Sequence, residues 1–329
     1  MTAPRLGAVL LSAIATVAIV APVLTPHTPS QSFADHENAP PMRPRLIRAD
    51  GRLGLPYVNR ITLVDRLERR YAEDPKNPAV LRWFRNGVIV SIDESAGPWL
   101  PLGTDAVGRD VFARLVYGAR LSLGVACVAT LGALGIGLLI GGAAGFAGGK
   151  LDTVLMAIAD FVLVLPAIYV VLAIRSALPV TVSVSQMFWI LTLVLAGAGW
   201  PVAARGVRGI IAAERTKEYA EAAYAMGSGP LRILLRHLMP ATVGFLGVCA
   251  TMMVPAFLLT EGTMSLVGFG FRAPTATWGA MLRDAWQGSA FTDAPWLMAP
   301  AATIVLTVLG LHLLTSGSAL EGHNPGTFQ

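Results

Sequence analysis

Charged residues are scarce in this sequence. Asp, Glu, Lys and Arg make up 14% of its 329 residues, whereas hydrophobic residues make up 54%. Soluble domains carry about 25% charged residues, so an ordinary soluble globular domain is excluded. Lipid, rather than water, is therefore expected to surround most of the chain.

Cysteine and catalytic motifs are scarce as well. The 2 cysteines, Cys127 and Cys249, fall within apolar runs, provide no disulfide framework and leave the redox compartment undetermined. The H-E-x-x-H and G-x-S-x-G motifs are missing, as are Cys/His clusters with metal-ligand spacing. The sequence therefore predicts neither a catalytic site nor a metal site.

Two glycine-rich stretches fail the requirements of nucleotide-binding loops. A phosphate-binding loop ending at Lys150 would need glycine at 144 and Ser or Thr at 151, where the sequence has Ala144 and Leu151. The G-x-G-x-x-A pattern at 268–273 follows an apolar run instead of a strand. The net charge of +5 comes without any nucleic-acid-binding signature. We therefore expect this chain to bind no cofactor, nucleotide or nucleic acid.

Long apolar runs, by contrast, are abundant. Segments without Asp, Glu, Lys or Arg are 6–24, 121–149, 161–174, 176–204, 238–260 and 294–320. About 20 apolar residues cross the hydrocarbon core as a helix, and the third run reaches this length by extending back to Thr153 through Asp160. The sequence thus predicts an all-α integral membrane protein with six transmembrane helices. The first run has an alternative interpretation, a cleaved secretory signal, but its apolar stretch exceeds the usual length of about 7 to 15 residues.

The short loops predict the orientation. Residues 205–237 contain six cationic and three acidic side chains, whereas residues 261–293 contain two cationic and three acidic ones. Because positive loops stay inside, the 205–237 loop and both termini are expected in the cytoplasm. The resulting parts are a first helix (1–25), an extracytoplasmic loop (26–118), a five-helix core (119–320) and a cytoplasmic tail (321–329).

The extracytoplasmic loop begins with an irregular spacer, because 26–56 is rich in proline. Residues 61–74 place Ile61, Val64 and Leu67 on one helical face, which predicts a short amphipathic surface helix.

Two further signals precede the second span. Asn86-Gly87 separates two β-prone runs and predicts a hairpin, which either decorates the outer surface or contacts an extracytoplasmic partner. Asp110 is suited to cap a helix lying at the membrane interface, with Arg114 opposite its apolar stripe. Within the second span, glycines at 137, 141 and 145 predict close packing against another helix, with a substrate-lining role as the alternative.

The cytoplasmic loop predicts a helix, a break and a second helix. Thr216 is expected to cap a helix over 217–226, and Gly227 to end it in a left-handed conformation. The Ser-Gly pair before Pro230 then caps a second helix, with proline at its first position.

The first of these helices is short and rich in alanine, so it needs a neighbour. The small side chains of this helix are expected to form a flat surface that fits into a groove; they are Ala220, Ala222 and Ala223. Glu218 and Glu221 are expected to bind cationic side chains there. The alternative is an ordinary interhelical loop of good helix formers.

The sequence Glu221-Ala222-Ala223, followed by Gly227 and a stretch ending at Pro240, resembles the "EAA" loop of ABC-importer permeases. Met239 stands where the family usually has Leu. The resemblance implies a coupling helix that docks on a separate ATPase. The implied coupling residues are Glu218, Tyr219, Glu221, Ala222, Ala223, Met226 and Gly227.

Three more stretches resemble the dipeptide/oligopeptide/nickel branch of these permeases: "LGTDAVGRDVFARLVYGARLSL", "ADFVLVLP" and "EGTMSLVGFGFRAPTATWGAML". The similarity covers residues 100–315, although the 26–100 insertion is longer than usual and the C-terminal stretch departs from the common ending. It implies a type I ABC-importer permease fold in the bacterial cytoplasmic (inner) membrane. The implied partners are a homologous second permease, two ATPase subunits that bind ATP and Mg, and an extracytoplasmic solute-binding protein.

The resemblance also implies residues of a translocation path or outer gate. They are Asp160, Pro166, Ser265, Gly268, Gly270 and Trp278. Asp160 either forms a helix–helix hydrogen bond or lines the path, and Glu261 is expected in solvent. Two rival functions are a proton-coupled secondary transporter using Asp160 and Glu261, and an intramembrane enzyme, which the missing catalytic residues disfavour.

Overall fold

The structure, a computed structural model, describes residues 3–47, 53–66, 68–85, 87–93, 96–165, 169–170, 173, 182–286 and 293–321. The chain divides into two compact units, each of which is described by itself. One unit comprises Met1–Ser122 and Gly262–Gly310, and the other comprises Leu123–Glu261 and Leu311–Gln329. Helices α3, α9 and α11 each continue from one unit into the other.

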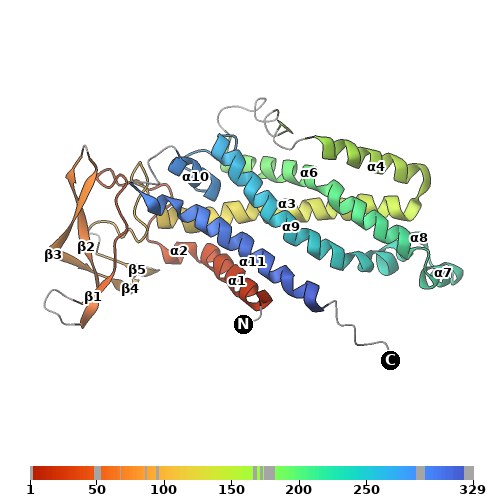
Figure 1. Ribbon diagram of the computed structural model, residues 1–329, viewed down its shortest axis with the longest axis horizontal. Coiled ribbons are helices and arrows are strands. Elements are labelled where there is room, and N and C mark those ends of the chain that lie inside the picture. The colour runs from red at the N-terminus through yellow and green to blue at the C-terminus, as the bar shows by residue number, and fades with distance from the viewer. Residues whose placement is uncertain are drawn as a thin grey trace. The chain divides into compact units, whose positions relative to one another are not determined.

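The helices of the first unit are labelled in Figure 1. They are α1 (Ala3–Ile19), α2 (Ala21–Leu24), the first part of α3 (Val111–Ala147), the end of α9 (Val243–Val267), α10 (Trp278–Trp286) and most of α11 (Ala299–Glu321). Arg120 on α3 donates 2.6 Å hydrogen bonds to the carbonyl oxygens of Ala18 and Ile19. Because helix C-termini leave carbonyl groups unpaired, this arginine caps α1.

Five strands follow α2, which corrects the all-α expectation. They are β1 (Arg45–Ile47), β2 (Leu53–Asp65), β3 (Arg70–Val80), β4 (Arg82–Arg85) and β5 (Val88–Ser91). An antiparallel sheet has the order β1-β2-β3, and β4 pairs with β5 in a separate hairpin. We call residues 33–100 the β module. Its buried core consists of Met42, Val58, Ile61, Ala79, Leu81, Ala96, Trp99 and Leu100.

The predicted surface helix over 61–74 is therefore wrong. Ile61 pairs with Glu73 across β2 and β3, and Ile61 is buried whereas Val64 is exposed. A strand alternates its faces at every residue, so the apolar residues that resembled a helical stripe lie on two sides of a sheet. Leu67 lies outside the described residues.

The predicted hairpin is confirmed. Arg85 pairs with Val88, and Gly87 has a φ of +76°, the positive value that a tight hairpin turn needs. Asn86 lies outside the described residues.

The second unit, in its described part, is built from helices. Besides its parts of α3, α9 and α11, it contains α4 (Gly149–Val164), α6 (Val184–Glu214), α7 (Glu218–Ala225), α8 (Pro230–Ile233), a π-helix (Leu234–Leu238) and a 3-10 turn (Met239–Thr242). Helix α3 packs closely on α6, because a Cβ built on Gly141 would lie 2.3 Å from the carbonyl oxygen of Ala204. The predicted close glycine packing is confirmed.

Four helices in the described part of the chain are long and apolar enough to cross a membrane: Val111–Ala147, Val184–Glu214, Pro230–Val267 and Pro295–Thr315. The chain is thus mostly helical with several spans. Helix α1 is apolar but has 17 residues, and α4 has 16. Six spans remain a prediction.

Helix α3 starts at Val111 and continues without a break, so the separate interfacial helix is wrong. The predicted cap is confirmed, because Asp110 Oδ1 accepts hydrogen bonds from the backbone N–H of Phe112 (2.9 Å) and Ala113 (3.3 Å). Arg114, expected on the polar side, is only 1% exposed.

Candidate functional site

The loop predicted for coupling begins at the turn between the end of α6 (Glu214) and the start of α7 (Glu218). Lys217 occupies the N-cap position of α7 without a side-chain cap. The predicted cap at Thr216 is wrong, because its hydroxyl donates to the carbonyl of Ala213, 2.9 Å away in the last turn of α6. The Tyr219 hydroxyl donates to Glu214 Oε2 at 2.6 Å. Burial and this carboxylate raise the pKa of Tyr219 to about 12, so it remains a neutral donor at physiological pH.

The end of α7 is fixed by a Schellman motif. Gly227 has a φ of +79°, as predicted. Its N–H donates to the carbonyl of Tyr224 (2.9 Å), and the N–H of Ser228 donates to that of Ala223 (3.0 Å). Pro230 begins α8 after the cap Gly229, also as predicted. The direction of the chain after α7 is therefore set by its own backbone.

The alanine face of α7 is turned inward. Ala220 is fully buried and Ala223 is 2% exposed. They pack in a cluster with Val207, Ile211, Ile233 and Leu238. Ala220 and Ala223 thus lie in a groove, as expected, and this groove is built by α6, α8 and the π-helix of the same chain. Ala222, expected on the same surface, is exposed instead.

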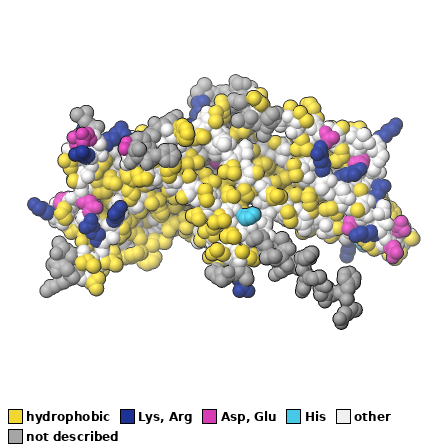
Figure 2. Space-filling view, viewed as in Figure 1, with side chains coloured by type: hydrophobic (Ala, Val, Ile, Leu, Met, Phe, Trp, Pro, Cys, Tyr) yellow, Lys and Arg dark blue, Asp and Glu magenta, His cyan; other side chains and the backbone are white. Residues whose placement is uncertain are grey.

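The opposite face of α7 is exposed and combines acidic with aromatic side chains. Its exposed residues are Glu218, Tyr219, Glu221, Ala222, Tyr224, Ala225, Met226 and Gly227. Met226 is 79% exposed and Tyr224 48% exposed. Figure 2 shows charged side chains gathered around α7 and over the β-strands, whereas α9 and α11 present mainly hydrophobic side chains. Aromatic residues and Met are enriched at protein–protein interfaces, so the composition of this exposed face is of the kind that such interfaces use.

Salt bridges join α6 to α4 beside this loop. Arg208 Nε lies 2.9 Å from Asp152 Oδ1, and Arg205 pairs with Asp160. The predicted helix–helix contact of Asp160 is therefore present, although its carboxylate remains 60% exposed. Pro166 lies outside the described residues.

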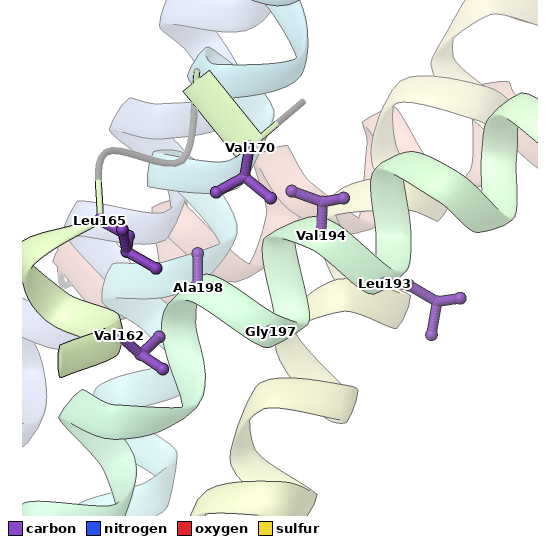
Figure 3. A pocket seen from close by; sticks show the side chains of 7 residues that line it. All are labelled: Val162, Leu165, Val170, Leu193, Val194, Gly197 and Ala198. Carbon is purple, nitrogen blue, oxygen red and sulfur yellow. The ribbon is translucent and has the colours of Figure 1, made fainter. Parts of the chain in front are cut away.

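A cavity of about 340 Å³ lies near this pair (Figure 3). Its lining residues are Val162, Leu165, Val170, Leu193, Val194, Gly197 and Ala198. All of these side chains are apolar or absent, so they supply no hydrogen bond by which a polar solute is recognised.

The other predicted path residues lie in the first unit, where α10 packs on the end of α9. Gly268, with a φ of +92°, follows α9. A Cβ built on Gly270 would lie 2.1 Å from Ser265 Oγ, and one on Gly279 would lie 2.8 Å from Ser265 Cβ. Trp278 is buried, and its Nε1 donates to the carbonyl of Leu115 at 3.0 Å.

Two predictions about this region have different outcomes. The Thr277 hydroxyl accepts a hydrogen bond from the N–H of Ala280 at 3.1 Å, so the predicted cap of α10 is confirmed. Glu261, expected in solvent, is 1% exposed, so this expectation is wrong.

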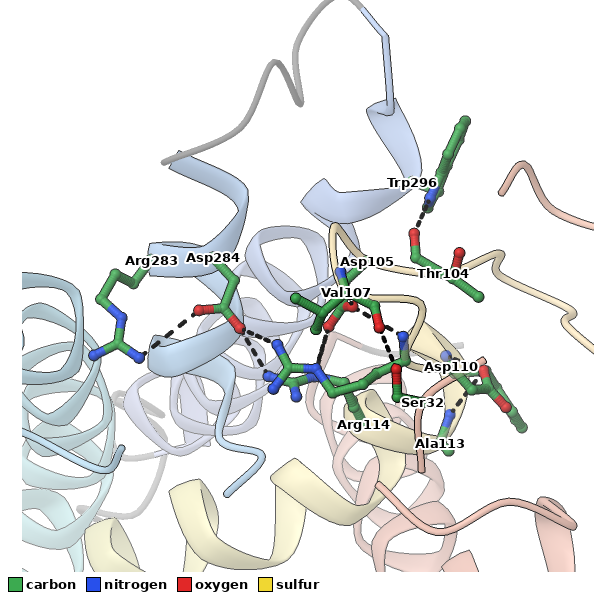
Figure 4. A network of polar contacts seen from close by, with 12 residues as sticks. Ser32, Thr104, Asp105, Val107, Asp110, Ala113, Arg114, Arg283, Asp284 and Trp296 are labelled. Atoms are coloured by element: carbon green, nitrogen blue, oxygen red, sulfur yellow. Dashed lines mark hydrogen bonds and ion pairs between the residues drawn. The ribbon is translucent and has the colours of Figure 1, made fainter. Parts of the chain in front are cut away.

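A buried charged cluster in the first unit was missed by sequence reasoning (Figure 4). Arg109 Nη2 and Arg114 Nη2 both donate to Asp284 Oδ2, at 2.8 and 3.0 Å. Arg109 Nε also donates to Asp105 Oδ2 at 2.7 Å. The motif G-T-D-A-V-G-R-D drew attention to this segment, but no local signal links it to Asp284.

The described residues contain no group of three or more His, Cys, Asp or Glu that could hold a metal ion. Several helices that are long and apolar enough to span a membrane, with a short exposed helix between two of them, are typical of a polytopic membrane protein. Residues 136–319 match the model of the family "Binding-protein-dependent transport system inner membrane component". The match covers more than half of the chain, which therefore belongs to this family.

Similar proteins include the oligopeptide transport system permease protein OppC of Bacillus subtilis (strain 168), which is 35% identical over 65% of this chain and 68% of its own length. The nickel transport system permease protein NikC of Escherichia coli (strain K12) is 34% identical over 68% of this chain and 77% of its own. Among solved structures, the inward-facing MetNI methionine ABC transporter matches with a TM-score of 0.47 and 20% identity, over 63% of this chain and 94% of that chain. The resemblance to permeases of the peptide and nickel branch is confirmed.

Proposed function

We propose that this chain is the permease subunit of an ATP-driven importer in the bacterial inner membrane, with α7 as its coupling helix. The observation that carries the proposal is the division of α7 into a buried alanine face and an exposed acidic and aromatic face. A helix seated in this way transmits force from a docked partner to α6 and to the spanning helix that follows. Both termini and α7 would lie in the cytoplasm.

The proposed assembly needs further subunits. Two separate ATPase subunits would bind ATP and Mg, a homologous second permease would complete the path, and an extracytoplasmic binding protein would deliver the solute. The relatives are named for oligopeptides and for nickel, so we propose one of these solute classes. This chain would contribute half of the path and no hydrolytic chemistry.

The proton-coupled alternative receives no support from the relatives, which are named as transport-system permeases. Its proposed relay residues also differ in setting, because Asp160 pairs with Arg205 whereas Glu261 is buried. An uncoupler that leaves uptake unchanged while ATP depletion stops it would support the ATP-driven importer.

Reversing the charge of Glu221 tests the coupling helix. We expect Glu221→Lys to reduce ATPase co-purification about tenfold, because a misplaced interface charge costs about 1.4 kcal/mol or more. The exposed Asp293 provides the matched control, Asp293→Lys, which makes the same charge change outside α7. Equal ATPase recovery with both variants would contradict the docking role.

Enlarging Gly270 tests the proposed gate. Gly270→Leu would push against the side chain and backbone of Ser265, so we expect at least tenfold slower uptake with normal ATPase binding. Gly247→Leu is the control on α9, because nothing lies within 4 Å of a Cβ built there. Normal uptake by the Gly270 variant would exclude this region from the gate.

A further inference from the structure

Asp284 is the contribution of α10 to the buried charged cluster. Arg109 lies in the loop before α3, and Arg114 lies in the first turn of α3. Both donate to the same oxygen, Oδ2 of Asp284. A shift of α10 along its axis would break both hydrogen bonds together, so this carboxylate fixes the end of α10.

The other end of α10 is held by close packing. A Cβ built on Gly279 would lie 2.7 Å from the Cα of Gly262 on α9. The N–H of Trp278 donates to Ser122 Oγ on α3 at 3.1 Å. Helix α10 is therefore held at both ends: one end packs against α3 and α9, and the other is joined by the cluster to α3 and to the loop before it.

The loop that supplies Asp105 and Arg109 is itself anchored to segments far away in the sequence. The N–H of Asn38 donates to the carbonyl of Asp105, and that of Phe33 donates to the carbonyl of Gly108, both at 2.9 Å. Trp296 Nε1 donates to the carbonyl of Thr104 at 3.0 Å. Hydrogen bonds therefore join this loop to the first residues of the β module, and Arg109 joins it to α10.

Stability alone does not account for such a cluster. A buried ion pair is often no more stabilising than apolar residues of similar volume. Arg114 is 1% exposed, and its Nη1 has no hydrogen-bond acceptor among the described residues. What the cluster provides is a defined geometry, because two arginines at different positions donate to the same oxygen of Asp284 and one of them also donates to Asp105.

We propose that Asp284 is a positioning residue that holds α10, and with it the contact between Ser265 and Gly279, in the orientation that solute passage requires. The functional part of this inference rests on the proposed importer function. Asp284 touches no solute in this scheme and acts through Arg109 and Arg114.

The first measurement of the test does not depend on transport. Ala285, the buried neighbour of Asp284 on α10, is replaced by cysteine in a chain with Cys127→Ser and Cys249→Ser. We expect Asp284→Asn to raise the rate of biotin-maleimide labelling at position 285 at least tenfold, with Asp293→Asn as the matched control. An unchanged rate would overturn the proposal.

The second measurement uses the complete importer in proteoliposomes, with radiolabelled trialanine and Ni²⁺ as probes. We expect Asp284→Asn to lower the amount of solute moved per ATP at least tenfold, while ATP hydrolysis stays within about twofold of the wild type. A merely structural defect would lower both in proportion and leave this ratio unchanged, which would refute the positioning role. If the wild-type importer moves neither probe, the proposed function fails, whereas the labelling result still decides whether Asp284 holds α10.

A second variant covers the case in which Asp284→Asn prevents assembly. Asp284→Asn combined with Arg114→Met removes one charge of each sign and avoids an uncompensated buried arginine. We expect the double variant to assemble and to keep the low transport ratio. A restored ratio, or failure to assemble, would show that the cluster serves only charge balance or folding.

Discussion

Ala223→Glu is expected to abolish the association of this chain with its ATPase. Ala223 is 2% exposed and packs among apolar side chains of α6 and α8. An uncompensated charge in such a site costs about 3 kcal/mol or more, which exceeds what an eight-residue helix can supply by itself. Since about 1.4 kcal/mol corresponds to tenfold, we expect about 100-fold less co-purified ATPase.

The control for this result is Ala213→Glu. Ala213 is exposed in the last turn of α6, so the same substitution there leaves α7 in place. Membrane insertion is followed in parallel for both variants. Normal ATPase recovery with Ala223→Glu would show that docking does not depend on the packing of Ala223 against α6 and α8.

Gly141→Leu is expected to prevent folding of the second unit. The obstacle is backbone, because a Cβ on Gly141 would lie 2.3 Å from the carbonyl oxygen of Ala204 and 2.9 Å from its Cα. Overpacking costs about 1 to 3 kcal/mol in ordinary cores and more where neighbours cannot move. We expect the monodisperse peak to disappear when the protein is analysed by size-exclusion chromatography in detergent.

Gly135→Leu provides a control on the same helix. Nothing lies within 4 Å of a Cβ built on Gly135, so the larger side chain has free space. We expect this variant to elute like the wild type. If Gly141→Leu also eluted normally, α3 and α6 would not depend on the close contact that the structure shows.

The features predicted correctly from the sequence depend on neighbouring residues. Gly227 and Pro230 mark the ends of helices through their own backbone preferences, and Asp110 caps a helix whose first N–H groups are two and three residues away. The glycines of α3 are likewise informative, because their spacing matches one helical face. Long apolar runs likewise predict the helices that are long and apolar enough to span a membrane, because length and hydrophobicity are properties of consecutive residues.

The errors arise where distant parts of the chain decide the outcome. Arg114 was expected on a polar face, because nothing near it in the sequence reveals Asp284, 170 residues away. Ile61 and Val64 fit a helical stripe, but pairing with β3 turned the segment into a strand. The sequence predicts a groove for the alanines of α7 but does not show that α6 and α8 form it.

The two faces of α7 separate two kinds of constraint. Substitutions at Tyr224 or Met226 change the exposed surface of α7, because both side chains are exposed. Substitutions at Ala220 or Ala223, by contrast, disturb the packing of α7 against α6 and α8. The exposed face of α7 can therefore change its side chains without disturbing the packing that holds this helix against α6 and α8.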